Sequence, residues 1–595
     1  MTVTINKIIN LLTFTWLTGP IFDKELRVSS RRKRNYAVRF AYIILLLIAA
    51  SLVWAQTVAY YNPVFQASRM SIAGIAITCT IVWFQFVATQ IVAVVMLSTA
   101  ISDEIYHKTL ATLMTTPITS FQIVMGKLLS KLLQILMLIA ISFPLLSIIR
   151  VFGGIPWNYI ISSFCLTIST VILVGSLSLF YSIFTRKAYV SIILTILTLF
   201  MIYLVFPALL AWMSAVSGGF NENVYFGFFG HTNPYFSMAI NTSMVQSRGA
   251  IPFFFSWPLA CSIILAFAAV LIAFSVKHVR NVARRQASGR ANAASRPAPV
   301  SQSGDPTEEI AHLYQSKIRP VKYSPVLWKE IRSPLLGKGK AKVMYIVGII
   351  ISLIPILIIY AIAAREGGLD DRGFHMFMVT VFMSVGCLFT LILPATCITS
   401  EKESRSWHLL LATTLTGWQI VFGKVIGSFR RCMPAWCYLF GHVIVFTLCG
   451  IIHPLGLLQM IIIVGGMCAL LTGSGIYFSA LFKRTTTAVI MNIIFAAVIW
   501  GGIPLVNSAI CELARVHDYR DTAQAYCNSI PFVQTAVSMD LTARNVNKLK
   551  DVRWIEGRFS PMASTMLILF FATVNSAVGL FFAWRAKKRF RKKIF

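Results

Sequence analysis

Long apolar stretches without charged residues alternate with short polar segments along the whole chain. A transmembrane helix needs about 20 consecutive, mostly apolar residues, and this criterion predicts six spans in each half of the sequence. The first six are expected at residues 36–60, 71–101, 121–150, 157–184, 188–216 and 253–276. The second six are expected at residues 343–364, 374–399, 428–452, 455–482, 486–510 and 561–584. The pattern therefore predicts an all-α polytopic membrane protein with about twelve transmembrane helices.

Composition supports this class and argues against a soluble protein. Hydrophobic residues make up 57% of the 595 residues and charged residues 12%, whereas soluble chains average about 25% charged residues. The net charge of +33 would suit nucleic acid, but the basic residues cluster between spans, at residues 31–34, 277–342 and 585–593. Lys and Arg collect on the cytoplasmic side of membrane proteins, beside anionic lipids. No zinc-finger or RNA-binding motif accompanies them. We therefore expect membrane lipids as partners, no nucleic acid, and two cytoplasmic termini.

Most of the eleven cysteines lie inside apolar spans, where cysteine behaves as a small hydrophobe. Cys511 and Cys527 are different because both fall in a loop that we expect outside the cell. They could form a disulfide in an oxidising compartment or remain two free thiols, and both alternatives stay open.

The two halves of the sequence repeat each other. Residues 101–127 match residues 398–424 without a gap, and ten of the 27 paired positions are identical. Three shorter pairs follow in the same order: 20–27 with 325–332, 184–186 with 482–484, and 233–236 with 530–533. Six spans per half is an even number, so the repeats are expected to be parallel, related by an axis along the membrane normal. We predict a first repeat at residues 1–280, a flexible cytoplasmic linker at 281–322 that is rich in Ala, Ser, Arg and Pro, and a second repeat at 323–595.

Motifs for catalysis are missing from the sequence. It contains no Gly-x-x-x-x-Gly-Lys-Ser/Thr phosphate loop, no His-Glu-x-x-His zinc motif and no Gly-x-Ser-x-Gly elbow. The predicted span cores also lack Asp and Glu, which ion-coupled carriers use as relays or ligands. His442 lies on a span, and we expect it to be a hydrogen-bonded packing residue. We therefore expect no enzyme activity, no metal and no directly bound cofactor.

Between the second and third spans, each half carries a charged segment that we predict to be a helix of about three turns. Its apolar positions are Leu110, Leu113 and Met114 in the first half, and Trp407, Leu410 and Leu411 in the second. Such a stripe can dock in a partner's groove. Glu104 and Glu401 lie near the helix start, where the dipole favours acids and where they could pair with a partner's arginine. The alternative is an ordinary capped helix packed on the bundle.

This segment resembles the signature of the type-2 ABC transporter permease family, approximately Glu-x-Glu-x-Gly-Thr-Leu-x-x-Leu-Leu-x-Thr-Pro followed by Gly-Lys. The first half matches at Glu104, Thr109, Leu110, Leu113, Thr115, Thr116, Pro117, Gly126 and Lys127. The second half matches at Glu401, Glu403, Ser406, Leu409, Leu410, Leu411, Thr413, Gly423 and Lys424. The entry segments also match, with Lys24, Glu25 and Arg27 in one half and Lys329, Glu330 and Arg332 in the other. The departures are Lys108 and Arg405 in place of Gly, Tyr106 in place of the second Glu, and Thr414 in place of Pro.

The resemblance implies the membrane-spanning subunit of an ABC exporter with two permease halves fused in one chain. The segments at residues 104–117 and 401–414, with Trp407 among them, would be coupling helices that meet separate ATPase subunits, which bind ATP and Mg. The second and fifth spans of each half would line a central pathway, and the location would be the bacterial cytoplasmic (inner) membrane. The alternatives are an ion-coupled secondary transporter or channel, and a non-transporting membrane scaffold.

Overall fold

The computed structural model describes residues 15–31, 33–58, 66–106, 109–113, 115–150, 155–185, 188–207, 210, 222–246, 255–287, 324–332, 353, 356–365, 367–504, 529–542 and 561–589. Throughout these residues the regular structure is helical. Ten of the helices are long and apolar enough to cross a membrane. Two shorter apolar helices, Tyr42–Ser51 and Ile356–Arg365, lie within the first and seventh predicted spans. The prediction of an all-α polytopic membrane protein is confirmed.

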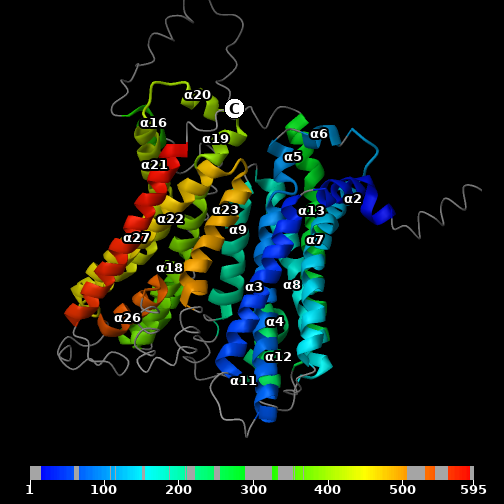
Figure 1. Ribbon diagram of the computed structural model, residues 1–595, viewed down its shortest axis with the longest axis horizontal. Helices are drawn as coiled ribbons and strands as arrows, with labels where there is room; N and C mark the ends of the chain where they lie inside the picture. Colours follow the sequence, from blue (N-terminus) through cyan, green and yellow to red (C-terminus); the bar gives the residue numbers. More distant parts are fainter. Residues whose placement is uncertain are drawn as a thin grey trace, which may run out of the picture. The chain divides into compact units, whose positions relative to one another are not determined.

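The chain forms two compact units, one of Met1–Arg284 with Ala497–Cys527 and the other of Arg285–Ala496 with Asn528–Phe595. From the N-terminal side the helices are α2 (Thr15–Ser30), α3 (Lys33–Val58), α4 (Gln66–Ser98), α5 (Ser102–Tyr106), α6 (Thr109–Leu113), α7 (Ser120–Ile149), α8 (Trp157–Phe184), α9 (Ala188–Phe200) with the π-helix η3 (Met201–Val205), α11 (Glu222–Thr232), α12 (Pro234–Gln246) and α13 (Trp257–Ala287). Figure 1 shows α2, α5 and α6 at one end of the first unit and α11 and α12 at the other.

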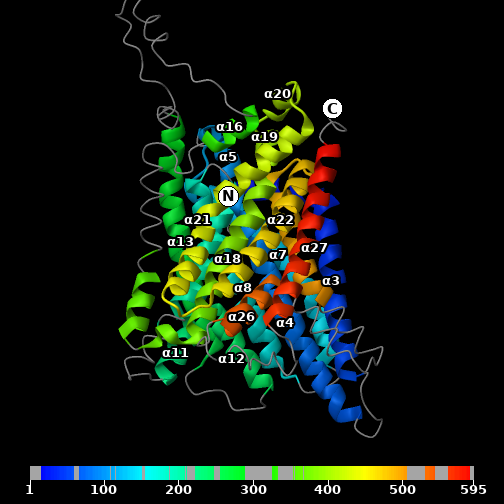
Figure 2. The same cartoon turned by 90° about the vertical axis from the view of Figure 1, so that its left-hand side faces the viewer.

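The later helices are α16 (Pro325–Arg332), the 3₁₀-helix η4 (Gly368–Asp370), α18 (Arg372–Thr396), α19 (Thr399–Glu403), α20 (Trp407–Leu411), α21 (Gly417–Leu448), α22 (Pro454–Leu481), α23 (Thr485–Ala497) with the π-helix η5 (Val498–Gly502), α26 (Pro531–Thr542) and α27 (Pro561–Arg589). Within the second unit, α16, α19 and α20 lie at one end and α26 at the other (Figure 2). Most of the predicted linker, and both Cys511 and Cys527, lie outside the described residues. The predicted repeat boundaries therefore stay predictions.

The third long helix of each half begins at a capping box. The Thr119 hydroxyl accepts from Gln122 N while the Gln122 side chain accepts from Thr119 N, and Thr416 and Gln419 do the same. A capping box satisfies two backbone donors that have no partner inside the helix. The second of these helices consequently begins at Gly417, three turns before the predicted start at residue 428.

A polar contact between the long helices and the far-end helices recurs in both units. In the first unit, Ser162 of α8 donates to Asn241 of α12 at 3.0 Å. In the second unit, Ser538 of α26 donates to Gln459 of α22 at 2.6 Å. Both pairs of positions are related by a displacement of 297 residues, with the hydroxyl and the amide exchanged. A buried hydroxyl needs a partner, so this exchange keeps the contact while the sequence changes.

Candidate functional site

The repeated segments at residues 101–127 and 398–424, together with their entry helices, fold as matching structures, which we call the first and second clamps. The first clamp comprises α2, α5, α6 and residues 120–131 of α7. The second comprises α16, α19, α20 and residues 417–431 of α21. In each clamp the chain leaves one long helix, passes through two short helices and enters the next long helix.

A buried serine anchors each clamp to its bundle. Ser182 of α8 accepts hydrogen bonds from the backbone N–H groups of Ile101 and Ser102, both at 2.9 Å. Ser479 of α22 accepts from Ile398 and Thr399 in the same way, again at 2.9 Å. The N–H groups that open a helix have no partner inside it, so each hydroxyl satisfies donors at the start of a short helix. The sequence analysis did not identify these two serines. A signal was nevertheless present, since they too stand 297 residues apart in the repeat.

In the first clamp the lysine of the Gly-Lys motif is buried and binds two oxygens of the turn. Lys127 donates to the Ala100 carbonyl at 2.7 Å and to Glu104 Oε1 at 3.0 Å, and its side chain is 6% exposed. Glu104 also accepts from the Thr109 hydroxyl. One turn further along α7, Lys131 pairs with Glu25 of α2 at 3.2 Å. Glu104 therefore braces the clamp internally.

In the second clamp one lysine joins the entry helix to the turn. Lys424 donates to Glu330 Oε1 at 2.7 Å and to Glu401 Oε1 at 2.6 Å, and its side chain is 4% exposed. Arg431 holds the other oxygen of Glu330 at 2.5 Å. Charges buried this deeply are stable only when they are paired. We call Lys424, Glu330, Glu401 and Arg431 the buried brace.

Two glycines allow the entry helix α16 to reach the buried brace. A Cβ at Gly423 would lie 2.8 Å from Val326 Cγ1 and 3.1 Å from the backbone N of Leu327. A Cβ at Gly427 would lie 2.8 Å from Glu330 Cβ. The glycine of the Gly-Lys motif thus provides the close approach that its lysine needs.

Acidification is expected to weaken the second clamp as Glu330 becomes protonated. Burial raises the pKa of the Glu330 carboxyl, but the positive charges of Lys424 and Arg431 lower it by more, so the pKa lies below its ordinary value. A carboxyl with a depressed folded-state pKa contributes stability above its unfolded pKa of about 4.3 and loses it as the pH falls through the folded value. Thermal unfolding in detergent of the wild type and Glu330→Gln should therefore differ at about pH 7, and the difference should shrink progressively as the pH falls below the unfolded pKa of about 4.3. A difference that stays constant with pH would contradict this.

In the second clamp the predicted three-turn helix is in fact two short helices, α19 and α20, and the residues between them show why. Arg405 has a φ of 57°, in the left-handed region. Its N–H bonds the Lys402 carbonyl at 3.2 Å, and Ser406 N bonds the Glu401 carbonyl at 3.0 Å. These two bonds form a Schellman motif, whose left-handed position is usually glycine. This geometry explains why the signature that the segment resembles has glycine at this position, and it explains the break that the sequence-based prediction did not include.

One residue of the predicted apolar stripe in each clamp is buried against the bundle, so the stripe as a whole is not the exposed docking surface that the sequence had suggested. Leu110 is fully buried, and Trp407 is 6% exposed in a cluster with Val326, Ile398 and Ala586. In a helix of only five residues, burying one large side chain against the bundle fixes which face points outward. Leu409 is the side chain left at the surface, with 74% exposure.

The other predicted residues take surface or supporting positions. Thr109, Thr116, Pro117, Thr413, Lys24 and Arg27 are exposed, Leu113, Leu410 and Ser406 are half-buried, and Gly126 is buried. Glu403 accepts from Thr485 N and from its hydroxyl, both at 2.7 Å, which places an acid at the start of α23. Lys329, 66% exposed, reaches Glu401 at 3.3 Å, and Arg332 stacks on Trp328 at 4.9 Å. Met114 lies outside the described residues.

Comparison with known proteins identifies the family of both halves. A family model described as ABC-2 family transporter protein matches the chain twice, over residues 20–280 and 256–584. No curated protein matches the chain. One match covers each clamp from residue 20 onward, and together the two matches span most of the sequence. The chain therefore belongs to the ABC-2 transporter family, as an integral membrane permease with two family domains in tandem.

Proposed function

We propose that this permease is the membrane-spanning subunit of an ATP-driven exporter, powered by two separately encoded ATPase subunits that dock on the clamps. The observation that carries the proposal is the rigid attachment of each clamp. The anchoring serine and the Glu–Lys pair tie the short helices to two or more long helices through buried contacts. Force applied to the short helices therefore moves the long helices with them instead of bending a loop.

The proposal places both clamps in the cytoplasm, where ATP is available. The basic residues at the ends of α13 and α27 support this side, because Lys and Arg concentrate on the cytoplasmic face. Both termini would then be cytoplasmic, in the cytoplasmic membrane of a bacterium.

The exposed tip of the second clamp offers a docking contact. Leu409 projects from α20 beside the exposed His408, and Arg405 is exposed on the preceding turn. An apolar side chain this exposed, outside the apolar part of the spans, fits an apolar groove on a partner. Glu401 is already paired with Lys424, so apolar contact supports docking better than a charge pair with a partner's arginine.

Replacing Leu409 with glutamate is expected to weaken binding of the ATPase subunit by on the order of thirtyfold, the effect of losing one interface hot spot. The chain would be purified from native membranes in mild detergent, and the co-purified ATPase measured by mass spectrometry and ATP hydrolysis. Val224→Glu is the matched control: Val224 is 66% exposed on α11, outside the predicted spans and at the opposite end of its unit from α5 and α6.

The expected result is loss of the ATPase from Leu409→Glu and its retention by Val224→Glu. Equal retention by both variants would contradict docking at α20. A wild-type chain that brings down no ATPase would contradict the exporter itself.

A further inference from the structure

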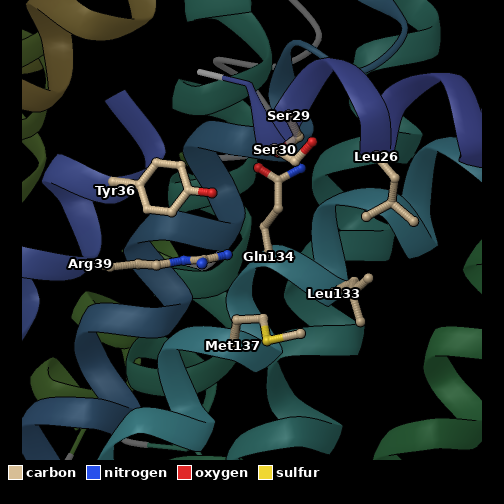
Figure 3. Close-up of a pocket in the computed structure, with 8 residues that line it drawn as sticks. All are labelled: Leu26, Ser29, Ser30, Tyr36, Arg39, Leu133, Gln134 and Met137. Atoms are coloured by element: carbon tan, nitrogen blue, oxygen red, sulfur yellow. The ribbon is translucent and has the colours of Figure 1, made fainter. Parts of the chain in front are cut away.

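A small cavity lies in the first unit where α2 meets α3 and α7 (Figure 3). Its volume is about 110 Å³, and its wall combines the C-terminal turn of α2 with one face of α7. Arg39 and Tyr36 border it from α3, Ser30 from α2, and Gln134 and Met137 from α7. Figure 3 shows the Arg39 side chain extending toward Gln134, with the serines above and Met137 below. A cationic and polar part therefore adjoins an apolar part.

The charge of Arg39 is not balanced by an anion within the described part of the chain. Its guanidinium is half-buried and lies 5.6 Å from the Tyr36 ring centroid. Among the residues that the structure describes, no carboxylate pairs with it, and Glu25 of α2 is already paired with Lys131. A half-buried guanidinium without an anion presents five donors in a geometry suited to phosphate.

The depth of the cavity matches the boundary between headgroups and acyl chains. Lys131 is the last charged residue on α7 before Arg150, and the 18 residues between them are uncharged. That length is close to one membrane span. Leu133 and Gln134 occupy the first turn of this stretch, so the cavity lies at its polar edge.

In the second unit, arginine side chains occupy the position that corresponds to this cavity. At the 297-residue displacement, Arg430 and Arg431 replace Leu133 and Gln134. Arg430 donates to the Glu330 carbonyl at 2.8 Å and also to the Ile331 carbonyl, at the end of α16. Arg431 binds the Glu330 carboxylate. The first unit lacks both guanidinium groups here, which leaves the end of α2 beside an open, positively charged space.

We propose that this cavity binds the phosphate group of an anionic phospholipid from the surrounding leaflet. Arg39 holds the phosphate oxygens, the Ser30 hydroxyl and the Gln134 amide lie at the headgroup, and Leu133 and Met137 contact the first acyl carbons. Tyr36, 57% exposed, forms the rim, as aromatic residues do at membrane interfaces. The bound lipid fixes the angle between the entry helix and the first span.

The test measures binding of phosphatidylglycerol to the purified full chain by native mass spectrometry in detergent. Phosphatidylcholine is the comparison lipid. It carries the same phosphate, but its choline cation cancels the net charge, so it should bind the wild type more weakly than phosphatidylglycerol does. Arg39→Gln should weaken the first phosphatidylglycerol site about tenfold, because one charge-assisted contact to the phosphate is lost. Leu133→Trp should have the same effect by filling the cavity without changing the charge. Arg31→Gln, which removes an exposed charge nearby, should keep wild-type affinity. Circular dichroism and the melting temperature verify that each variant is folded.

Three outcomes would overturn the proposal. Equal losses in Arg39→Gln and Arg31→Gln would indicate general surface charge. Loss in Arg39→Gln without loss in Leu133→Trp would show that the cavity is not the site. Displacement of the lipid by excess inorganic phosphate would assign the site to a soluble anion.

Discussion

Replacing Lys424 with methionine is expected to destabilise the protein by about 3–5 kcal/mol, because it leaves buried carboxylates without their cation. Glu330 is 5% exposed and Glu401 is 13% exposed, so water cannot take the place of the ammonium group. Arg431 still reaches one oxygen of Glu330, and the exposed Lys329 still reaches Glu401 Oε1 at 3.3 Å, but neither replaces the buried ammonium group between the two carboxylates. Glu401 Oε2 already lacks a hydrogen-bond partner among the described residues. Methionine keeps the length and apolar stem of lysine, so the loss reports on the charge.

The matched control is Lys131→Met in the first unit. Lys131 and Glu25 form a similar ion pair, but their side chains are 19% and 28% exposed. A solvent-accessible pair contributes about 0–1 kcal/mol, so this variant should remain close to the wild type. Unfolding by SDS titration in mixed micelles measures both. Equal losses in the two variants would show that burial does not set the strength of the buried brace.

Replacing Gly473 with alanine is expected to push α22 away from α27. Overpacking lowers the free energy of unfolding by about 1–3 kcal/mol, and we expect a loss at the upper end of that range. A Cβ at Gly473 would lie 2.6 Å from the carbonyl carbon of Gly579 and 2.7 Å from its Cα. Both are backbone atoms of a long helix, so no side chain can rotate away. Gly466 meets Ala572 in the same manner, with its added Cβ 2.7 Å from Ala572 Cα. Small residues spaced in this way let membrane helices pack backbone to backbone.

Gly465→Ala on the same helix is the control. A Cβ at Gly465 would meet nothing within 4 Å, so the substitution should be neutral or should stabilise by up to about 1 kcal/mol through helix propensity. Melting temperatures in detergent would compare the two variants directly. If Gly473→Ala were as stable as Gly465→Ala, the close approach of α22 and α27 would be wrong.

Several features depend on local sequence and can be predicted from it alone. The spans follow from uninterrupted apolar length, since a backbone in lipid must satisfy its own hydrogen bonds. The duplication follows from the ungapped match of residues 101–127 with 398–424. The predicted hydrogen bonding of His442 is also confirmed, and its partners are Tyr360 at 2.5 Å and His375 at 3.3 Å.

Other features depend on residues that are distant in the chain. His375 and His442 stand 67 positions apart, and no periodicity links them. Lys424 reaches Glu330 across 94 positions, and Ser479 reaches Ile398 across 81. A motif shows that a lysine recurs, but only the packing of α16 on α21 shows what that lysine binds.

By itself, the sequence determined that this chain crosses the membrane many times, that it is duplicated, and that each half carries a charged turn between its second and third spans. Only the tertiary structure decided which side of each turn faces the bundle. Leu110 and Trp407 are buried, Leu409 is exposed, and Glu104 and Glu401 bind lysines of their own chain. The physical reason is that a five-residue helix has too few turns for periodicity to define a face, so contacts with distant helices set its orientation.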